Sequence, residues 1–328
     1  MKPWLLADIG GTWARFALLA EGAIGPIEAL HTGAHGSPSD AIRHFLRERG
    51  MASPAGAVIA AAGPVDDGRC QLTNASWLLD GAQLARDLGC PSVQIVNDLQ
   101  ALAWAVPHFT SDDLLPLGGD RGLASEPVAL IAPGTGLGVA CYVPGGDAAR
   151  VLATEGGHAS LAAEDAEEQA VIDILRRQHG HVSAERVLSG SGLESIHAAL
   201  RELGGLPPSD LEASAIVEAA GDGDTPHSAV ARRTVEMFTA VLGSVAGNLA
   251  LTFGARGGVL IGGGIAPRLV AHLQRPAFRL RFESKGRLSA YLHPIPIRLI
   301  RRKDPTFVGL RALALKGGAS NSRTGATR

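Results

Sequence analysis

Short apolar runs alternate with glycine-rich turns along this chain of 328 residues. Two early runs, Trp4–Ile9 and Arg15–Ala20, predict buried β-strands separated by a tight Gly10-Gly11-Thr12 turn. Apolar runs predict further strands at Ala57–Ala62, Val93–Val96, Val128–Ala132, Val139–Val143, Val259–Ile261 and Ile297–Ile300. Apolar positions at helical spacing predict helices beginning at Ser37-Pro38 and spanning Leu99–Val106, Glu164–His179, Met237–Phe253 and Asp304–Leu315. This alternation is typical of an α/β protein.

One arrangement of strands and turns occurs twice. A strand, a Gly/Thr turn and a returning strand span Asp8–Leu18, and the same order returns at Pro133–Val143. Two such hairpins, one in each domain, can hold a polyphosphate from both sides. Glycine hairpins are common, so the repeat by itself does not identify a function.

Composition narrows the class of protein. The chain is 46% hydrophobic and 19% charged, as expected of a globular protein, and its length predicts two domains. A net charge of −2 gives no reason to expect nucleic acid or an anionic membrane as a partner. The apolar run before Asp8 is too short for a signal peptide, and Met237–Phe253 contains Ser244 and Asn248, which favours a buried helix over a membrane span.

The cysteines and the end of the chain add two expectations. Three scattered cysteines argue against a disulfide framework and against a cysteine zinc site, and they fit a reducing, cytoplasmic setting; they are Cys70, Cys90 and Cys141. The small, polar residues 317–328 predict a disordered tail.

The first glycine turn has the chemistry of a phosphate loop. Glycines without a Cβ allow backbone N–H groups to approach phosphate oxygens, and Thr12 adds a hydroxyl. Asp8, at the end of the preceding strand, can hold Mg²⁺ through its bound waters. The turn taken alone is equally explained as an ordinary hairpin that follows an acidic residue.

The second turn, Gly134-Thr135-Gly136-Leu137-Gly138, offers the same kinds of donor. It lacks the Lys that follows the last glycine of a Walker loop, which separates the chain from P-loop kinases.

Asn97-Asp98 directly follows an apolar strand. In open α/β sheets the carboxyl ends of strands face the ligand, so Asp98 there can take a proton from an attacking hydroxyl. The alternative is that Asp98 is the N-cap of the next helix, and by itself this motif favours the cap.

A third cluster, Glu155-Gly156-Gly157-His158, places a carboxylate and an imidazole around two glycines and can bind a polyhydroxy ligand. The neighbouring sequence has no second His at ligand spacing and no Cys, which argues against zinc. Glu185 could be a further hydroxyl acceptor, or an acidic residue in the first turn of a helix.

These motifs, in this order, resemble those of the bacterial glucokinases, which belong to the hexokinase/actin-like ATPase superfamily. The similar strings extend from residue 7 to about residue 287, and include ADIGGTWARFAL, LTNASW, IVNDLQA, PGTGLGVA, TEGGH, HVSAERVLSGSGL, GNLALTFGARGGVLIGGGIAPR and FESKGR. The resemblance implies a two-domain actin-like ATPase (ribonuclease H-like) fold with an interdomain cleft. It implies a small domain of residues 1–108 plus 299–316 and a large domain of residues 109–298.

The resemblance also implies residue roles. The first phosphate loop would be Ala7, Asp8, Ile9, Gly10, Gly11 and Thr12, with Asp8 holding Mg²⁺ through water. The second would include Gly134, Thr135, Gly136 and Gly138, and the adenosine would lie near Gly262, Gly263 and Gly264. Asp98 would be the catalytic base, and the sugar would be bound by Asn97, Asp98, Glu155, His158, Glu185 and Asn74.

The implied activity is transfer of the γ-phosphoryl group of ATP to the 6-hydroxyl of glucose, by a cytoplasmic homodimer that uses Mg²⁺. Trp13 and Ala75 depart from the family pattern, which bears on nucleotide affinity rather than on the reaction. Two alternatives stay open: a kinase for another hexose or an amino sugar, and an actin- or chaperone-like ATPase without sugar chemistry.

Overall fold

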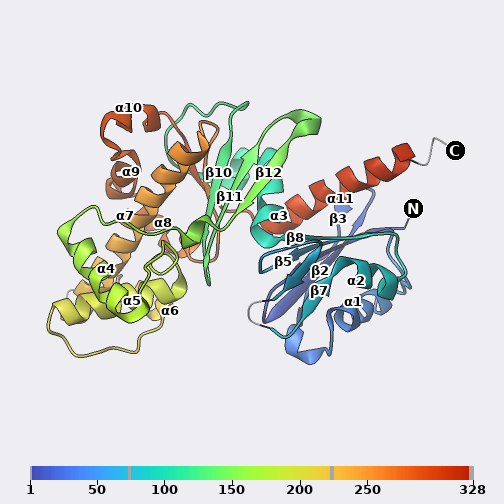
Figure 1. Ribbon diagram of the computed structural model, residues 1–328, viewed down its shortest axis with the longest axis horizontal. Coiled ribbons are helices and arrows are strands. Elements are labelled where there is room, and N and C mark those ends of the chain that lie inside the picture. The colour runs from blue at the N-terminus through green and yellow to red at the C-terminus, as the bar shows by residue number, and fades with distance from the viewer. Residues whose placement is uncertain (1, 73–74, 222–224, 325–328) are drawn as a thin grey trace. The chain divides into compact units, whose positions relative to one another are not determined.

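The computed structural model describes residues 2–72, 75–221 and 225–324 (Figure 1). Contacts within the chain divide it into two compact units. Unit 1 combines Met1–Phe109 with Arg302–Arg328, and unit 2 is the continuous segment Thr110–Arg301. The borders expected from the sequence, after residues 108 and 298, lie within a few residues of these divisions.

Unit 1 is built on a six-stranded sheet with the order β3-β2-β1-β5-β8, in which β4 also pairs with β2. The strands are β1 (Trp4–Ile9), β2 (Trp13–Ala20), β3 (Ala23–Ile24), β4 (Glu28–His31), β5 (Ala57–Ala61) and β8 (Val93–Asn97). β1, β5 and β8 run parallel, whereas β1 and β2 form an antiparallel hairpin. A separate two-stranded sheet joins β6 (Arg69–Gln71) to β7 (Leu78–Asp80). The carboxyl ends of the three parallel strands therefore lie at one edge of the main sheet.

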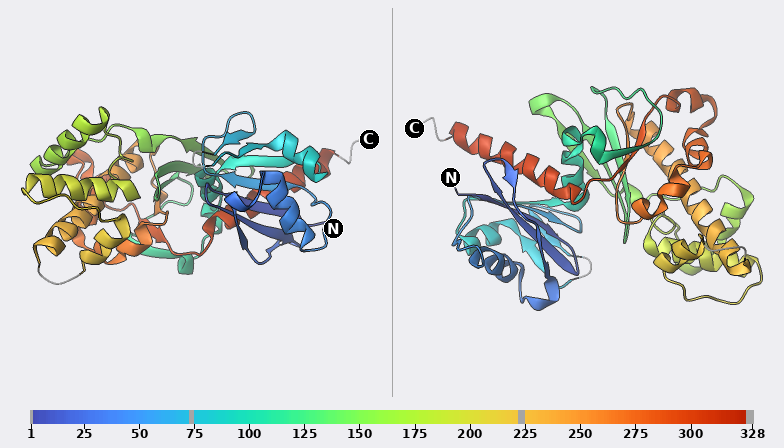
Figure 2. Two further views of the ribbon diagram at one scale, coloured as in Figure 1. Left: turned by 90° about the horizontal axis from the view of Figure 1, so that it is seen from below. Right: turned by 180° about the vertical axis from the view of Figure 1, so that it is seen from behind.

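Helices cover both faces of this sheet. Successive β1 side chains point to opposite faces, so Leu5 and Leu6 belong to different hydrophobic clusters. One cluster packs against α1 (Pro38–Arg47) and α2 (Gly81–Leu88), and the other against α3 (Asp98–Trp104) and α11 (Pro305–Thr324). Figure 2 shows the red C-terminal helix α11 lying along the blue N-terminal sheet. The last helix thus completes the core of the unit that the first strand begins.

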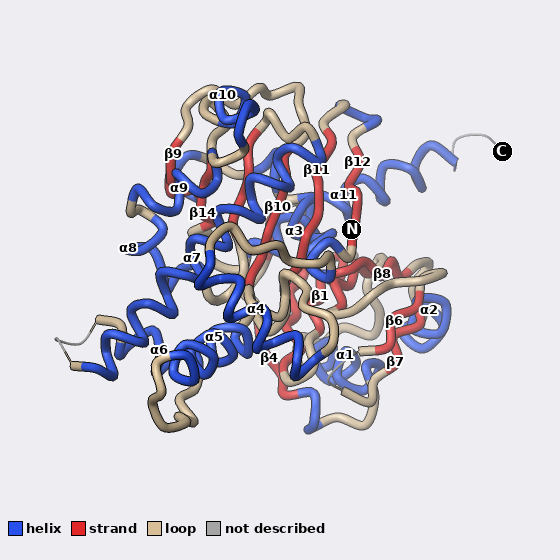
Figure 3. The backbone as a smooth tube through the Cα atoms, turned by 60° about the vertical axis from the view of Figure 1, so that its left-hand side comes forward, coloured by secondary structure: helices blue, strands red, loops and turns tan. Residues whose placement is uncertain are grey.

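Unit 2 repeats the strand arrangement of unit 1. Its sheet has the order β12-β11-β10-β13-β14-β9. The strands are β9 (Leu114–Gly118), β10 (Val128–Pro133), β11 (Leu137–Val143), β12 (Arg150–Thr154), β13 (Gly258–Ile261) and β14 (Ile297–Ile300). β10, β13 and β14 are parallel, and β10 and β11 form an antiparallel hairpin, as β1 and β2 do. Strands are red in Figure 3, where β10 and β11 lie side by side. The repeated strand, turn and strand predicted from the sequence are confirmed as equivalent hairpins.

Most of the helices belong to unit 2. They are α4 (Ala166–His179), α5 (Gly190–Leu203), α6 (Ala213–Ala219), α7 (Pro226–Phe253), α8 (Val270–Leu273), α9 (Pro276–Glu283) and α10 (Ser289–Leu292). By length and composition Ser228–Phe253 could cross a membrane, but 78% of its most apolar window is buried inside the protein. α7 is therefore a core helix, as its interrupting polar residues predicted.

Two glycines allow α9 to cross α7 closely. A Cβ at Gly243 would lie 2.5 Å from the carbonyl oxygen of Phe278, and one at Gly247 would lie 2.4 Å from that of Phe282. Real Cβ atoms do not approach oxygen so closely, so larger side chains at these positions would push the helices apart.

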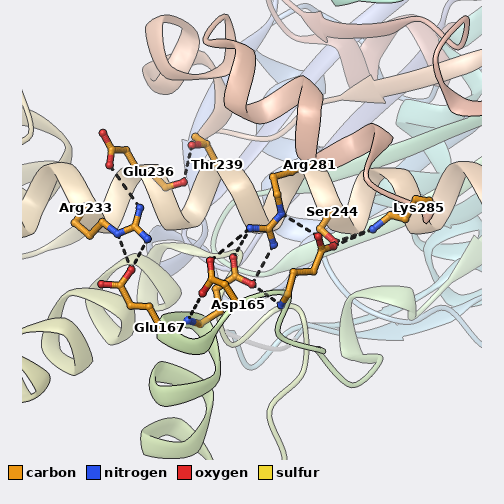
Figure 4. Close-up of polar contacts among 10 residues, drawn as sticks. Asp165, Glu167, Arg233, Glu236, Thr239, Ser244, Arg281 and Lys285 are labelled. Atoms are coloured by element: carbon orange, nitrogen blue, oxygen red, sulfur yellow. Dashed lines mark hydrogen bonds and ion pairs between the residues drawn. The ribbon is translucent and has the colours of Figure 1, made fainter. Parts of the chain in front are cut away.

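Buried charges connect the start of α4 to α7 and α9 (Figure 4). Arg281 makes two hydrogen bonds to Glu168, of 2.7 and 3.0 Å, and an ion pair of 3.1 Å to Glu164. Lys285 bonds Glu164 at 3.0 Å and Ser244 at 2.9 Å, and Ser244 in turn donates to Glu164. Because Glu168 is almost fully buried, its charge requires the paired Arg281 guanidinium.

The predicted elements differ from the structure mainly at their ends. β2 and β11 start two residues earlier than predicted. In the first hairpin cross-strand pairing begins right after the Gly10-Gly11-Thr12 turn, and in the second it begins at Leu137, inside the Gly134–Gly138 motif. The helix predicted to end at Leu315 continues to Thr324, so the prediction of a disordered tail from residue 317 is wrong as far as Thr324; residues 325–328 lie outside the described part. No proline interrupts residues 316–324, so the helix continues although Gly317 and Gly318 have low helix propensity.

Candidate active site

Asp8 and Arg15 face each other across the first hairpin. They are register partners in β1 and β2, and the Arg15 guanidinium pairs with the Asp8 carboxylate. The other arm of Arg15 bonds Asp304, just before α11, at 2.6 Å. Burial raises the pKa of the Asp8 carboxyl, while the Arg15 charge acts in the opposite direction. The candidate magnesium residue Asp8 is thus held in place by Arg15, which is itself held by Asp304 just before the last helix.

The Gly10-Gly11-Thr12 turn closes the same hairpin. Gly10 donates its N–H to the Trp13 carbonyl at 2.9 Å. The Trp13 side chain is 54% exposed and packs edge-on against His31, with ring centroids 5.2 Å apart. An exposed aromatic side chain therefore stands at the end of the first candidate phosphate loop.

The sequence left two roles open for Asp98, the N-cap of the next helix and the general base. In the structure Asn97 is the cap, and Asp98 remains available as the candidate base. Asn97 is the N-cap of α3, and its side-chain oxygen accepts from the N–H groups of Leu99 and Gln100. Its amide nitrogen donates to the Gly63 carbonyl at 3.1 Å. Asp98 is the first helical residue, half-buried, and one carboxylate oxygen accepts the Leu99 N–H at 2.8 Å. The expectation that Asp98 is the cap is wrong, because the preceding residue supplies it.

Cys70 lies within electrostatic reach of Asp98. Burial raises the pKa of the Cys70 thiol, and the negative charge of Asp98 raises it further. Asn74, the sugar-binding candidate four residues along, lies outside the described residues. The three cysteines are buried, and none of them forms a disulfide with another.

In unit 2, Glu185 connects the second glycine turn to the Glu155–His158 segment. One of its carboxylate oxygens accepts the Leu137 N–H at 2.9 Å, and the other lies 3.8 Å from Nδ1 of His158. A Cβ at Gly136 would lie 2.5 Å from the first of these oxygens, so a side chain there would displace this carboxylate from its present position. Glu185 is therefore not merely an acidic residue at the start of a helix.

His158 stands between two carboxylates. Its Nε2 atom lies 3.9 Å from Glu155, while Nδ1 faces Glu185. The side chains of Glu155 and His158 are 69% and 59% exposed, and that of Glu185 is 31% exposed. Gly157 anchors this segment, since its carbonyl accepts the Glu185 N–H and a Cβ there would lie 2.0 Å from the Leu137 carbonyl. Exposed acceptors flanking an imidazole can bind several hydroxyl groups of one ligand.

The third glycine segment lies beside the second. The Gly262 N–H donates to the Ile131 carbonyl at 2.9 Å. Gly263 has a φ of +78°, and a Cβ there would lie 2.2 Å from the Pro133 carbonyl. A side chain at Gly264 would meet nothing within 4 Å. This segment is thus fixed against the end of β10, where the second turn begins.

Within each unit, the predicted residues gather at the carboxyl ends of parallel strands. β1 and β8 carry Asp8, the first turn and Asn97-Asp98, and β10 and β13 lead into the two glycine segments of unit 2. The sequence reasoning did not assign Arg15 or Asp304. Arg15 belongs to the string ADIGGTWARFAL, which could have marked it, but no local signal connects Asp304 to residues so far away in the chain.

Two α/β units with equivalent hairpins, each carrying a glycine turn at the carboxyl ends of its parallel strands, define the class of actin-like ATPase folds. A family model described as glucokinase matches residues 5–317, so the chain belongs to the glucokinase family. It is 42% identical to a glucokinase of Paramagnetospirillum magneticum over 94% of this chain and 96% of that one. A glucokinase of Aromatoleum aromaticum is 43% identical, covering 94% and 93% of the two chains. A crystal structure of glucokinase from an Antarctic psychrotroph has a TM-score of 0.86 at 34% identity, covering 95% of this chain and 98% of that one. The predicted fold class is thereby confirmed.

Proposed function

We propose that this protein transfers the terminal phosphoryl group of ATP to the 6-hydroxyl of glucose, giving glucose 6-phosphate and ADP. The observation that carries the proposal is the set of Glu155, His158 and Glu185, bonded to the second glycine turn through the Leu137 N–H. A polyhydroxy-ligand site joined to a phosphate loop suits a sugar kinase. An ATPase without sugar chemistry has no use for it.

In this proposal Asp98 accepts the proton from the 6-hydroxyl as the phosphorus–oxygen bond forms and ADP departs. Glu155, His158, Glu185 and Asn97 orient the other hydroxyls, and Asn74 is a further candidate for binding the sugar. Asn97 already bonds Gly63 and the start of α3, so it offers the sugar only its remaining hydrogen-bonding capacity. Little covalent chemistry is needed, and positioning with electrostatic stabilisation supplies most of the rate.

The phosphates would be bound by the first loop, from Ala7 to Thr12, and by the second. In the second loop the Gly134 and Leu137 N–H groups are bonded to Gly136 and Glu185. The proposed donors there are the Thr135 and Gly136 N–H groups and the Thr135 hydroxyl. Gly262, Gly263 and Gly264 would accommodate the adenosine, since Gly264 leaves open space.

Asp8 suits an outer-sphere magnesium ion. Among the described residues no cluster of three or more His, Cys, Asp or Glu could hold a metal directly, whereas Mg²⁺ on phosphates usually keeps its waters and needs one carboxylate. Arg15 bonds one oxygen of Asp8, which leaves the other to face such a water. Mg²⁺ would neutralise charge on the transferred phosphoryl group.

The sharpest test offers purified protein a panel of sugars with ATP and Mg²⁺ and resolves the products by mass. Glucose 6-phosphate as the main product supports the proposal, whereas preference for another hexose or an N-acetylated amino sugar would revise the substrate. ATP hydrolysis that needs no sugar would refute sugar-kinase activity. Parallel reactions with ADP or polyphosphate identify the phosphoryl donor.

Binding measurements test the sugar residues separately from turnover. Glu155→Gln and His158→Ala should each weaken glucose binding in calorimetry, because each removes a group that faces the proposed ligand. Glu202→Gln, an exposed carboxylate on α5, is the control. Unchanged glucose affinity in both site variants would show that the sugar binds elsewhere.

We also propose that the enzyme is a cytoplasmic homodimer without nucleic-acid or membrane partners. This extends the resemblance stated above, and light scattering on the purified protein measures the oligomeric state.

A further inference from the structure

Thr32 contacts the first glycine turn from outside every motif described above. It begins a short 3-10 helix (Thr32–Ala34) directly after β4 and is buried, with 4% of its surface exposed. Its hydroxyl donates to the Gly11 carbonyl at 2.6 Å, and its N–H donates to the Thr12 carbonyl at 3.0 Å. One residue therefore bonds two successive carbonyl groups of the turn.

These two bonds fix the direction of the donors on the other side of the turn. In a planar trans peptide the C=O and the following N–H point in opposite directions. The Gly11 carbonyl shares its peptide plane with the Thr12 N–H, and the Thr12 carbonyl shares its plane with the Trp13 N–H. With both carbonyls turned toward Thr32, both N–H groups point away from it, as a backbone anion site requires.

A third hydrogen bond, between the first residue of the turn and the residue after it, closes the hairpin. Gly10 donates to the Trp13 carbonyl, which closes the hairpin and prevents the Trp13 peptide from rotating freely. Glycines at positions 10 and 11 would otherwise allow many backbone conformations. The turn therefore depends on outside contacts, and Thr32 supplies two of them.

We propose that Thr32 is a positioning residue that orients the N–H groups of the first glycine turn toward the terminal phosphates of the nucleotide. This inference rests on the proposed function, which places those phosphates at Gly10–Thr12. Thr32 touches no substrate in this proposal and acts only through the Gly11 and Thr12 carbonyls. Its hydroxyl is the part that a substitution can remove without changing the shape of the side chain.

A matched pair of variants tests the hydroxyl. Thr32→Val keeps the volume and the backbone N–H but removes the donor, whereas Thr32→Ser keeps the donor and loses a methyl group. Calorimetry with Mg²⁺ and a non-hydrolysable ATP analogue should show affinity about three- to tenfold weaker for Thr32→Val, the range expected of one hydrogen bond. Thr32→Ser should stay within about twofold of the parent, and glucose affinity measured without nucleotide should be unchanged in both.

Steady-state kinetics provide a second readout. The KM for ATP should rise in Thr32→Val while the KM for glucose does not, and circular dichroism should show that both variants are folded. Equal nucleotide affinity in Thr32→Val and the parent would overturn the inference, and so would equal losses in both variants, since the methyl group would then be responsible. If the parent protein binds no nucleotide, the proposed function fails first, which distinguishes the two failures.

Discussion

At the scale of single residues, neighbouring positions settle which chemistry a side chain can perform. Asn97 caps α3 with its own oxygen, so Asp98 is not needed as the cap and stands half-buried on the first turn. Both residues have types that commonly cap helices, and the sequence pattern favoured Asp98, which is the wrong one of the two. The choice depends on the backbone: Asn97 is extended and Asp98 is helical. A cap and a candidate base are thus adjacent.

Asp98→Asn should lower turnover by about 10²- to 10⁴-fold, because the amide keeps the shape of the side chain but cannot accept the proton. Glucose binding, followed by calorimetry, should be retained. Asp120→Asn, at an exposed position in unit 2, is the control and should leave turnover unchanged. Near-normal turnover in Asp98→Asn with sugar still bound would remove Asp98 from the proton transfer.

At the scale of elements, close backbone contacts decide which helices can pack together. α11 lies against α3 at Gly309, where a Cβ would come within 1.7 Å of the Ala101 carbonyl oxygen. Farther along the same helix, a Cβ at Gly317 would make an ordinary contact of 3.6 Å with Trp4. Nothing in the sequence around these two glycines distinguishes them. In the structure only Gly309 lies so close to a neighbouring backbone that a side chain cannot be accommodated.

Gly309→Ala should therefore lower the free energy of unfolding of unit 1 by about 1–3 kcal/mol or more, since 1–3 kcal/mol is the usual cost of overpacking. Gly317→Ala should be neutral or stabilising, since alanine is favoured over glycine in helices by about 1 kcal/mol. Urea unfolding followed by circular dichroism measures both. Equal effects in the two variants would mean that α11 does not pack against α3 at Gly309.

The charge cluster between α4, α7 and α9 gives a pH dependence. Burial tends to raise the pKa of Glu164, but the bonds from Ser244 and Lys285 and the charge of Arg281 outweigh it and hold the pKa below its ordinary value. The unfolded chain therefore binds this proton more readily than the folded chain, and stability falls as the pH falls through about 4.5 and below.

Glu164→Gln removes this titration and should flatten the loss of stability on the acid side. The midpoint of urea unfolding, measured between about pH 3.5 and 6, checks the change. At neutral pH the variant should be less stable than the parent, because Arg281 and Lys285 lose a charged partner. If the two proteins lose stability in parallel below pH 4.5, Glu164 does not carry the effect.

At the scale of the whole molecule, the two units differ in how the chain builds them. Unit 2 is one continuous segment with its own hydrophobic core, whereas unit 1 needs α11 from the far end of the chain to cover one face of its sheet. Leu6, Val58 and Val96 on that face pack against α11 residues such as Leu310. A unit with a complete core can fold alone.

Residues 110–301 expressed alone should therefore unfold in one cooperative thermal transition. Residues 2–109 expressed alone should not, because the face that α11 covers would be exposed to water. Differential scanning calorimetry distinguishes the two outcomes. A cooperative transition from residues 2–109 would show that α11 is dispensable for the core of unit 1.

Much of this protein follows directly from the sequence. The apolar runs specified β1 and β14 to the residue and located most of the other long strands, because buried parallel strands are continuously hydrophobic. The short strands β3 and β4 gave signals too brief to assign. The helix α5 was missed although Leu193, Ile196 and Leu200 stand at helical spacing behind the capping Ser189. The glycine turns and the acidic and histidine motifs were visible because their chemistry is local.

Tertiary structure decided how those local pieces work together. Arg15 meets Asp304, Thr32 meets the first glycine turn, and Glu185 meets Leu137, all through contacts between residues well separated in the chain. No periodicity or spacing encodes such contacts, since they arise only when sheets and helices pack into one core. The sequence determined which groups are available for binding and catalysis, and the packing of distant elements determined how they are held, because hydrogen bonds and ion pairs require proximity that the chain acquires only on folding.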